Sequence, residues 1–251
     1  MPEDVVVITG ASRGLGRATA LELARRGAAL LICARASEDL TRTEAALRAL
    51  GAEVAAVAAD LRSPRDIERI AARAFDRFGH VDALLNNASE LGPTPLPFLV
   101  DYPPAAFDDV VQVDLVAPFR LTRALIGDMI RRGSGRVVNI SSDVAVTGYA
   151  GWGAYAASKA ALDSLTRTWA AELEGTGVRV WSVDPGDMDT AMHRAALPED
   201  DPAALLHPAT VAPVLADLLT GRIDPPNGAR LRAPDLLAQR SDPGALAGQR
   251  S

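Results

Sequence analysis

The sequence predicts an α/β protein in which one parallel sheet is covered by helices on both faces. Short, continuously apolar segments such as 5–9 and 29–34 alternate with longer segments whose apolar residues recur at helical spacing. Strands that are apolar on both faces are typical of parallel sheets with right-handed crossovers. No linker or internal repeat divides the chain. We therefore expect one doubly wound domain, with about seven strands, over 1–238.

Each element follows from local patterning. Ser63 and Pro64 mark the start of the third helix, because serine caps helices and proline is favoured at their first position. A proline-rich loop at 92–104 separates the fourth strand from a long helix. The expected strands are 5–9, 29–34, 52–60, 81–88, 135–142, 178–186 and 229–234, and the expected helices are 16–26, 38–50, 64–78, about 104–131, 152–174 and 209–220.

Two C-terminal segments do not share this alternation. Residues 187–208 are acidic and weakly periodic, and we expect a substrate flap or short helices there. The acidic stretch 198–202 within it is expected to be a solvated loop. Residues 239–251 are polar and contain glycine and proline, so a flexible tail is expected.

Composition excludes several classes of protein. The net charge is −6, and no basic stripe is present, which argues against a nucleic-acid or anionic-membrane partner. No stretch approaches the ~18 apolar residues of a membrane span, and no secretory leader is recognisable, so a cytoplasmic location is expected. Cys33, the only cysteine, is expected to be a buried apolar residue.

The three histidines offer no metal site, because they are far apart and lack ligand spacing. His193 could reach the substrate, although exposure to solvent is the favoured interpretation. The other two histidines are His80 and His207.

The stretch TGASRGLG (9–16) follows the first strand and opens the first helix. Its glycines allow a tight turn and let backbone N–H groups approach a diphosphate at the helix N-terminus. A plain turn is the alternative, but the position between strand and helix favours a dinucleotide site. The expected contacts from this loop are Gly10, Ser12, Arg13, Gly14, Leu15 and Gly16.

The end of the second strand indicates which dinucleotide is bound. A carboxylate there would bind the ribose 2′-hydroxyl, but the sequence has Ala34 and then Arg35, with Arg13 in the glycine loop nearby. Two guanidinium groups suit a 2′-phosphate, which predicts NADP(H) over NAD(H). The alternative is that Arg35 is a solvated charge. Asp60 and Leu61, after the third strand, are expected near the adenine; the alternative for Asp60 is a helix cap.

Four further motifs lie in order along the chain: NNA (86–88), NISS (139–142), YAASK (155–159) and DPGDMDT (184–190). With the glycine loop, they make the chain resemble the short-chain dehydrogenase/reductase family, from about Val5 to Thr190. The resemblance implies a Rossmann-type domain and an NAD(P)-dependent oxidoreductase that acts on C=O or CH–OH groups.

The resemblance assigns the reaction centre. Ser142 would donate a hydrogen bond to the substrate carbonyl, and Tyr155 would donate the proton, while Ser141 would pack in the strand. Lys159 follows Tyr155 by one helical turn and would favour the phenolate, as would the positive ring of oxidised nicotinamide; moving the Tyr155 pKa from ~10 to ~7 corresponds to roughly 4 kcal/mol. Lys159 is the only lysine in the chain, at a point where a compact ammonium suits ribose hydroxyls better than a planar guanidinium.

Other cofactor contacts are implied in the same way. Pro185 and Gly186 would turn the chain over the nicotinamide, and Thr190 would bind its carboxamide; the alternative is a turn capped by Asp189 or Thr190. Asn87 and Ala88 would line the adenosine and ribose. Asn139 is expected to tie neighbouring strands together.

The chain departs from the family pattern in three places. Asp114 stands where an asparagine supports the proton relay, and it is included among the catalytic residues because it could pair with Lys159. Ser89 replaces the usual glycine after NNA. The C-terminal GARLRAPD replaces a family motif that often packs at a subunit interface, which leaves a homotetramer in doubt; a homodimer through helices 104–131 and 152–174 is the safer expectation.

The residues flanking the centre predict a mostly apolar pocket for a medium-sized ketone or aldehyde. Packing within loops is the alternative for each of them. They are Ser89, Leu91, Val144, Tyr149, Trp152, Met188 and Met192.

The favoured function is an NADPH-dependent carbonyl reductase. An NAD-dependent alcohol dehydrogenase on the same fold is the first alternative. A dinucleotide-binding protein without turnover is the second, and the only feature that supports it is Asp114.

Overall fold

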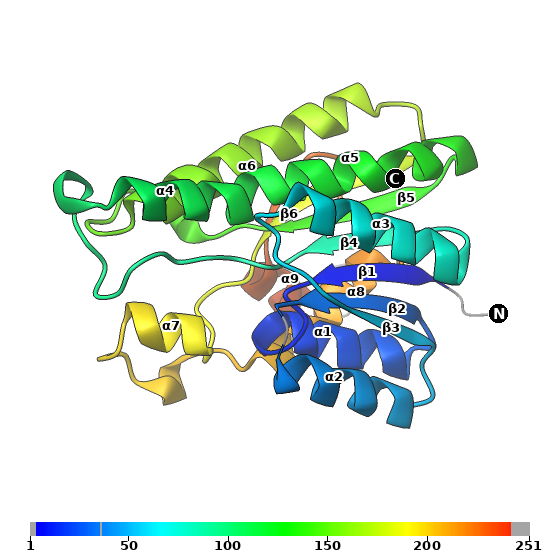
Figure 1. The fold of residues 1–251 in the computed structure, drawn as a ribbon, viewed down its shortest axis with the longest axis horizontal. Helices are drawn as coiled ribbons and strands as arrows, with labels where there is room; N and C mark the ends of the chain where they lie inside the picture. The colour runs from blue at the N-terminus through cyan, green and yellow to red at the C-terminus, as the bar shows by residue number, and fades with distance from the viewer. Residues whose placement is uncertain (1–3, 36, 242–251) are drawn as a thin grey trace.

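A single parallel sheet forms the centre of the molecule (Figure 1). The computed structural model describes residues 4–35 and 37–241. Within them the strand order is β3-β2-β1-β4-β5-β6-β7, which confirms the predicted doubly wound architecture. The strands are β1 (Val5–Thr9), β2 (Ala29–Ala34), β3 (Val54–Ala58), β4 (Ala83–Asn86), β5 (Gly135–Ile140), β6 (Val178–Asp184) and β7 (Arg230–Arg232).

Helices cover both faces of the sheet. One face carries α1 (Gly14–Arg25), α2 (Glu38–Ala49), α8 (Pro208–Leu219) and α9 (Ala233–Ser241), and the other carries α3 (Pro64–Phe78), α4 (Pro104–Val111), α5 (Ala117–Arg132) and α6 (Gly153–Glu172) (Figure 1). Helix α7 (Ala191–Ala196) stands apart from both layers. The short 3₁₀ turns are η1 (Leu99–Asp101), η3 (Asp143–Ala145) and η4 (Pro202–Ala204).

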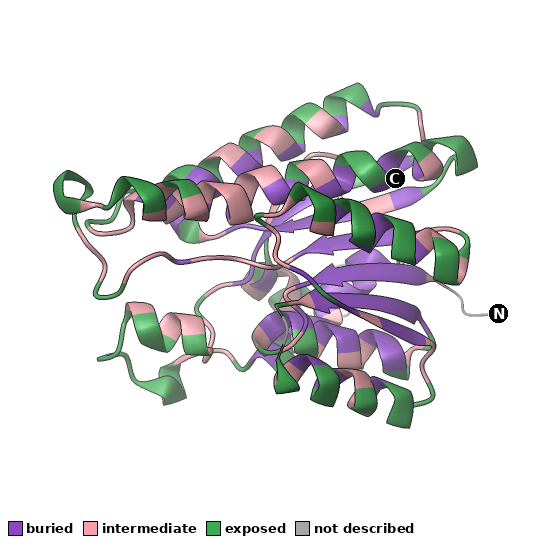
Figure 2. Cartoon of the chain, viewed as in Figure 1, coloured by how far each residue is buried: buried purple, intermediate pink, exposed green. Residues whose placement is uncertain are grey.

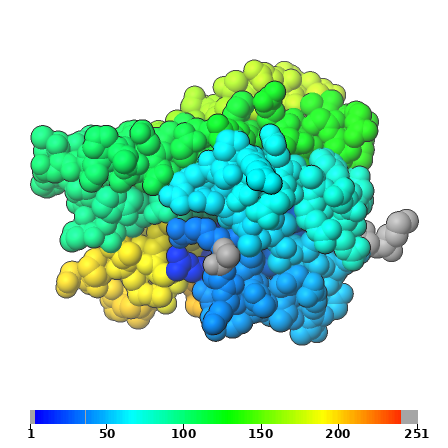
Figure 3. Space-filling view, in the orientation of Figure 1, coloured from blue at the N-terminus to red at the C-terminus, as the bar shows by residue number. Residues whose placement is uncertain are grey.

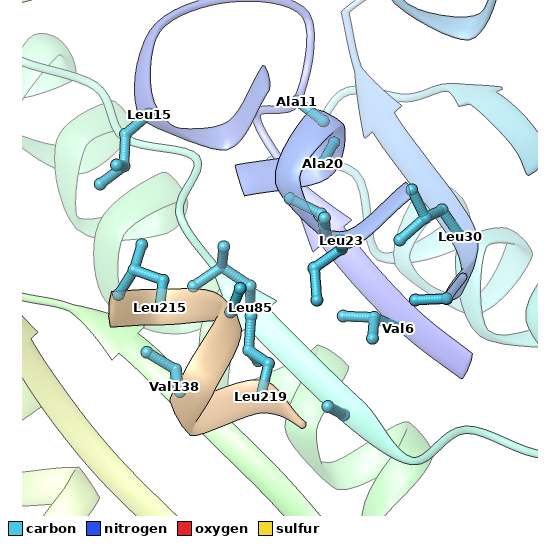
Figure 4. Packing of buried hydrophobic residues seen from close by; sticks show 14 of the residues in the cluster. Val6, Ala11, Leu15, Ala20, Leu23, Leu30, Leu85, Val138, Leu215 and Leu219 are labelled. Carbon is cyan, nitrogen blue, oxygen red and sulfur yellow. The ribbon is translucent and has the colours of Figure 1, made fainter. Parts of the chain in front are cut away.

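Alternation along the strands divides the core into two layers. Val6 and Ile8 of β1 pack with α1 and α8, whereas Val7 packs with α3 and α5 on the opposite face. This is the period of two that a strand imposes on its side chains. The central strands are therefore almost entirely buried, whereas the outer helix faces and many loops are exposed (Figure 2). Figure 4 shows the first layer, where Leu23 and Leu215 lie over Val6, Leu85 and Val138.

Most predicted boundaries are confirmed, and β1, β2 and α3 have the predicted limits. Ser63 caps α3, as its hydroxyl accepts the Asp66 N–H. The predicted helix at 104–131 is instead interrupted by one π-helical turn, η2 (Gln112–Val116). The sequence analysis missed α9, which ends at Ser241; the rest of the tail predicted at 239–251 lies outside the described residues.

The C-terminal edge of the sheet is short. The strand predicted at 229–234 is β7, which has three residues and pairs with the end of β6. No described helix is both long enough and apolar enough to cross a bilayer.

Candidate active site

A cavity of about 1000 Å³ opens at the carboxyl ends of the strands, where ligands bind in open parallel sheets. All but two of the predicted site residues line it. Gly16 and Asp114 are the two exceptions, and both are buried. The predicted residues that line the cavity are Gly10, Ser12, Arg13, Gly14, Leu15, Arg35, Asp60, Leu61, Asn87, Ala88, Ser142, Tyr155, Lys159, Pro185, Gly186 and Thr190.

Two glycines of the glycine loop, Gly10 and Gly16, have no room for a side chain. A Cβ added to Gly10 would lie 2.7 Å from the Cα of Ala88, and one on Gly16 would lie 2.5 Å from the Gly10 carbonyl oxygen. Gly10 also has a φ of +66°, which L side chains rarely adopt. Asn87 holds the loop in place, because its Nδ2 donates to the carbonyl oxygens of Thr9 (2.9 Å) and Gly10 (3.2 Å). Asn87 therefore has a structural task besides lining the cavity.

The start of α1 fits the diphosphate of a dinucleotide. Arg13 occupies the N-cap position, but its side chain makes no capping hydrogen bond. The first-turn N–H groups have no partner within the helix, and Gly14 and Leu15 line the cavity. A close-packed glycine loop beside such a helix end fits a phosphate group.

Two arginines line the end of the cavity where the adenosine is expected. Arg35 extends from β2 with a side chain that is 68% exposed, and its Nη1 lies 4.0 Å from Oε2 of Glu90. Arg13 is exposed on the neighbouring loop and contributes to lowering the pKa of Asp39, after the larger effect of Arg42. Two guanidinium groups therefore lie at the end of β2, with the carboxylates of Glu90 and Asp39 close by.

Asp60 lines the cavity but does not cap a helix. Its carboxylate accepts from Nε and Nη2 of Arg62, at 3.1 and 2.7 Å, and this pairing lowers the Asp60 pKa. The cap of α3 is Ser63, so the alternative interpretation of Asp60 is wrong.

Tyr155 and Lys159 lie one turn apart on α6 and both line the cavity. Lys159 is only 2% exposed, and its Nζ donates to the carbonyl oxygen of Ile140 (2.9 Å), the last residue of β5. The same Nζ lies 5.3 Å from the centre of the Tyr155 ring. The helix and the strand end therefore fix the ammonium beside the phenol.

The pKa of Tyr155 does not follow the sequence prediction. Burial is the largest cause and raises the pKa above its usual value of 10.0. Lys159 lowers it, Asp114 raises it, and hydrogen bonds with Ser89 and Ser142 lower it. The expected fall towards 7 is therefore wrong for the protein's own groups, because burial and Asp114 outweigh Lys159.

Asp114 sits in the π-helical turn η2 and is completely buried. Its Oδ1 accepts the Glu90 N–H (2.7 Å), its Oδ2 accepts the Ser89 hydroxyl (2.7 Å), and Oδ2 lies 3.7 Å from Nζ of Lys159. The predicted Asp114–Lys159 pair is therefore present. Burial raises the Asp114 pKa, and Lys159 with the two hydrogen bonds opposes that rise. The π-helical turn places the Asp114 carboxylate beside Lys159. Such turns are frequent at functional sites.

Ser142 lies two residues after β5 and lines the cavity, and the neighbouring Ser141 is buried. The Ser142 hydroxyl donates to Oδ1 of Asp143 (2.9 Å) and accepts the Val144 N–H (3.4 Å). The Ser142 side chain also contributes to lowering the pKa of Tyr155. Asn139, two residues before Ser141, joins Asn86 of β4 to Thr166 of α6, which confirms its predicted structural task.

Arg230 is a site residue that the sequence analysis missed. From β7, its Nε donates to Oδ2 of Asp163 (3.0 Å), and its Nη2 donates to the Ser142 carbonyl oxygen (2.7 Å) and to Oδ2 of Asp184 (3.2 Å). Asp184 in turn accepts the Gly186 N–H (3.0 Å). The Arg230 guanidinium therefore joins the backbone at Ser142 to Asp184, and Asp184 holds the turn that contains Gly186. The unusual GARLRAPD motif was the available signal, but only the fold shows what its arginine contacts.

The segment containing α7 lies against the glycine loop. In Figure 3 its yellow atoms lie beside the blue atoms of the N-terminal segment. A Cβ on Gly14 would lie 3.7 Å from Cγ2 of Thr190. The Thr190 hydroxyl accepts the His193 N–H (3.2 Å) and caps α7, which was the alternative interpretation of this turn.

His193 is not the exposed histidine that the sequence favoured. Its side chain is 11% exposed and lines the cavity, and its Nε2 lies 2.8 Å from Oδ2 of Asp200. The remainder of 198–202 is largely exposed, as predicted. No cluster of potential metal ligands occurs among the described residues, and burial raises the pKa of the Cys33 thiol to about 12.

All seven predicted substrate-wall residues line the cavity. Trp152 contacts Tyr155, with ring centres 5.7 Å apart. Leu91 and Val144 are buried in the wall, whereas Tyr149 is 48% exposed. An apolar wall therefore adjoins the Tyr155 phenol.

Comparison with known proteins identifies the class. The family model for short chain dehydrogenases matches residues 4–201, so the chain belongs to this family. It is 40% identical over 187 residues to 1-deoxy-11-beta-hydroxypentalenate dehydrogenase of Streptomyces exfoliatus, covering 74% of this chain and 68% of that protein. It is 34% identical over 188 residues to a 3-oxoacyl-acyl-carrier-protein reductase of Thermotoga maritima, covering 75% of each.

Solved structures agree. A short chain dehydrogenase of Shigella flexneri complexed with NADP superposes with a TM-score of 0.87 at 30% identity, covering 93% of this chain and 98% of that one. An NAD⁺-bound xylitol dehydrogenase also matches, with a TM-score of 0.80 at 27% identity over 92% of this chain and 97% of that one. The chain is therefore a nicotinamide-dependent oxidoreductase that acts on CH–OH or C=O groups of a small molecule.

Proposed function

We propose that this chain is an NADPH-dependent carbonyl reductase that acts on a ketone or aldehyde. The observation that carries the proposal is the placement of Tyr155, Ser142 and Lys159 around one end of a cavity that begins at the glycine loop. A tyrosine phenol whose pKa is not lowered is protonated at neutral pH, so Tyr155 is able to donate a proton to a carbonyl oxygen.

The residues of the centre divide the reaction between them. A nicotinamide dinucleotide bound in the cavity would supply the hydride. Ser142 turns its hydroxyl from Asp143 to the carbonyl oxygen of the substrate, and Tyr155 transfers its proton to that oxygen. Lys159 stabilises the phenolate that remains, because its ammonium is held beside the ring by the Ile140 carbonyl.

The remaining site residues support binding. Gly10 and Gly16 are closely packed, and together with Gly14 at the start of α1 they fit the diphosphate. Arg13 and Arg35 favour NADP(H), because guanidinium groups bind a 2′-phosphate bidentately. Segment 187–208 is proposed to close over the substrate, since Thr190 and His193 already line the cavity.

The apolar wall favours a medium-sized apolar substrate. Trp152, Leu91 and Val144 offer apolar surface next to Tyr155, and the exposed Tyr149 adds a hydroxyl at the opening. This surface suits a carbonyl compound with an alkyl or aryl substituent better than a sugar or a hydroxy acid.

The first test is a pair of binding titrations with NADPH and NADH, followed by turnover of a panel of ketones and aldehydes. Tighter binding of NADPH and turnover of apolar carbonyl compounds would support the proposal. Tighter binding of NADH, with oxidation of alcohols only, would replace it by the alternative of an NAD-dependent alcohol dehydrogenase. Glu90 near Arg35 and the NAD⁺-bound structural relative favour testing that alternative. Binding without any turnover would support the non-catalytic alternative.

Subunit assembly is proposed through α5 and α6. Phe119 of α5 is 38% exposed and stacks on Trp169 of α6, with ring centres 6.2 Å apart. An apolar pair on the outer face of two neighbouring helices suits a homodimer contact, and sedimentation of Phe119→Glu beside the parent would test it.

A further inference from the structure

Three separate segments carry the reaction centre, and the Arg230 side chain contacts all three. Ser142 follows β5, the turn containing Gly186 follows β6, and helix α6 carries Tyr155 and Lys159. Arg230 lies on β7, the edge strand beside β6. Its guanidinium donates hydrogen bonds to a group at the end of β5, to one at the end of β6 and to one on α6. One side chain therefore ties the three segments together.

The contact with the first segment is to the backbone of Ser142 itself. Nη2 of Arg230 donates to the Ser142 carbonyl oxygen at 2.7 Å, and the Ala145 N–H donates to the same oxygen at 3.1 Å. A carbonyl oxygen has two lone pairs, so these two donors satisfy it. The Ser142 hydroxyl donates to Asp143, which is exposed, so solvent can replace that bond. The backbone contact with Arg230 is therefore the firmer restraint on the position of Ser142.

Asp163 connects the same guanidinium to the helix that carries the phenol. Tyr155, Lys159 and Asp163 are spaced by four residues, so they follow one another along one face of α6. Oδ2 of Asp163 accepts from Nε of Arg230 at 3.0 Å, while its Oδ1 is buried and has no hydrogen-bond partner among the described residues. Burial of a carboxylate is unfavourable unless it is paired, so Asp163 depends on Arg230.

Asp184 connects Arg230 to the turn at the end of β6. This aspartate is 3% exposed and lines the cavity. Its Oδ2 accepts from Nη2 of Arg230 at 3.2 Å, and its Oδ1 accepts the Gly186 N–H at 3.0 Å. Gly186 has a φ of +75°, in the region that favours glycine. The shape of this turn therefore depends on a carboxylate whose other oxygen is held by Arg230.

The planar fork of the guanidinium allows one side chain to make all of these contacts. Its Nε donates to Asp163, while its Nη2 donates both to the Ser142 carbonyl oxygen and to Asp184. An ammonium is a point charge on a flexible stem and cannot reproduce this geometry. An ion pair that served stability alone would need the carboxylates but not the Ser142 carbonyl oxygen.

We propose that Arg230 is a positioning residue that fixes Ser142 and the Gly186 turn relative to helix α6. Arg230 does not line the cavity, so it acts through these segments and not on the substrate. A displacement of about 1 Å in a reaction centre can lower the rate about 10²-fold. The consequence for catalysis rests on the proposed function, whereas the restraint on the two backbone segments does not.

The first variant removes the ion pair without leaving a charge unpaired. Arg230→Leu alone leaves Asp163 buried without its partner, which lowers stability whatever else Arg230 does. When Asp163→Leu is added, the urea midpoint should return most of the way to the parent value, because apolar replacement of both partners is often neutral. The Ser142 carbonyl still lacks its donor, so kcat with NADPH and the best carbonyl compound should stay about tenfold below the parent. Recovery of kcat together with stability would overturn the proposal.

Hydrogen exchange in the free protein measures the restraint without any turnover. The Ala145 N–H donates to the Ser142 carbonyl oxygen, and the Gly186 N–H donates to Asp184. In the double variant these two amides should exchange about tenfold faster than in the parent, because the acceptors have lost a charged donor. The amides of β1 are the internal reference and should change little. Equal acceleration in β1 would show a global loss of stability in place of a positioning role.

Arg230→Lys decides the case in which the double variant does not fold. It keeps the positive charge but loses the fork, so its urea midpoint should stay close to the parent value. Its kcat should fall by about threefold or more, while the affinity for NADPH stays close to the parent value because the glycine loop is untouched. A parental kcat in this variant would contradict the need for the fork.

Arg26 provides a matched control for that variant. Its side chain is 12% exposed, against 21% for Arg230, and it joins α1 to α8 outside the cavity lining. Like Arg230, it donates to two carboxylates and one carbonyl oxygen, those of Glu22, Asp217 and Pro213. Arg26→Lys should leave kcat and the two reporter amides unchanged. An equal fall of kcat in both lysine variants would reduce the effect of Arg230 to stability.

The two measurements separate this proposal from the proposed function. If the reporter amides accelerate as expected but the parent reduces no carbonyl compound, the proposed function fails and the restraint by Arg230 stands. If the parent reduces carbonyl compounds and the amides of the double variant keep their parent rates, the positioning role fails and the function stands. Faster exchange with an unchanged kcat would also refute the positioning role.

Discussion

The two ends of the cavity hold their charges in opposite ways. At the adenosine end Arg13 and Arg35 are exposed, and the distance from Arg35 to Glu90 is 4.0 Å. At the reaction centre Asp114 and Lys159 are almost completely buried, and hydrogen bonds fix each of them. Solvent therefore screens the charges at the adenosine end, but it does not screen the charges at the reaction centre. Substitutions at the adenosine end should therefore adjust preference, whereas those at the centre should remove function or stability.

The sharpest test of the buried end is Tyr155→Phe. Loss of the proton donor should lower kcat/KM for carbonyl reduction by about 10²–10⁴-fold. Dinucleotide binding and the melting temperature should stay close to the parent values, because only one hydroxyl is removed. Steady-state kinetics with NADPH titrations would check this.

Tyr102→Phe is the matched control for that variant. Tyr102 lies outside the cavity lining, and its buried hydroxyl has no hydrogen-bond partner among the described residues. Its loss should leave turnover unchanged and the free energy of unfolding equal or slightly higher. If Tyr155→Phe retained parent turnover, another group would have to donate the proton.

Arg230 tests whether buried charge also holds the site together. Arg230→Leu would leave the nearly buried Asp163 without its guanidinium partner, and would leave the nearly buried Asp184 only the more distant Arg232, at 3.8 Å. We expect the free energy of unfolding to fall by about 3 kcal/mol, as is typical when one partner of a buried ion pair is removed. Urea denaturation would measure it.

Arg232 provides the comparison on the same strand. Its side chain is 55% exposed, and its nearest carboxylate oxygen is at 3.6 Å, so Arg232→Leu should cost less than about 1 kcal/mol. An equal loss of unfolding free energy in the two variants would show that the buried partners of Arg230 do not add to its contribution.

The contrast between the two ends also explains what the sequence could predict. Gly10, Tyr155 and Thr190 were found because turn geometry and motif spacing are local properties. Arg230 was missed because its partners lie on β5, β6 and α6, and nothing local joins them. The Ser89–Asp114 hydrogen bond could not be predicted for the same reason, although each of the two residues departs from the family pattern. Lys159 lowers the Tyr155 pKa as predicted, but the larger effect of burial was not predicted, because burial cannot be read from a charge at helical spacing.

A smaller effect is expected at the exposed end. Arg35→Asp should shift the ratio of NADPH to NADH affinity by about tenfold or more towards NADH, because it removes a phosphate partner and adds a repelling charge. The two dissociation constants, measured by nicotinamide fluorescence, would check it. Arg25→Asp, on an exposed part of α1 outside the cavity lining, is a control that should leave the ratio unchanged. An unchanged ratio in Arg35→Asp would remove the argument for NADP(H).

The smallest effect is expected at Asp60, whose pKa is lowered by the neighbouring Arg62. A carboxylate with a lowered pKa in the folded state stabilises the protein above its unfolded pKa, and that contribution is lost as the pH falls through the folded value. Asp60→Asn should therefore cost less than about 1 kcal/mol at pH 7 and nothing near pH 2. Urea denaturation at both pH values would measure the difference.

Asp108→Asn controls for that effect, since Asp108 is exposed on α4. Its free energy of unfolding should match the parent at both pH values. A loss at Asp60→Asn that persisted at low pH would show that the Arg62 pairing is not its cause.

Burial of the only lysine has a practical consequence. Lys159 is 2% exposed, and its amine is held by the Ile140 carbonyl, so amine-directed reagents can reach this side chain only when the site opens. Every other basic residue apart from the histidines is an arginine, which such reagents ignore. Acylation at this one nitrogen, followed by mass spectrometry, would count opening events of the active site, and the chain carries that reporter without any engineering.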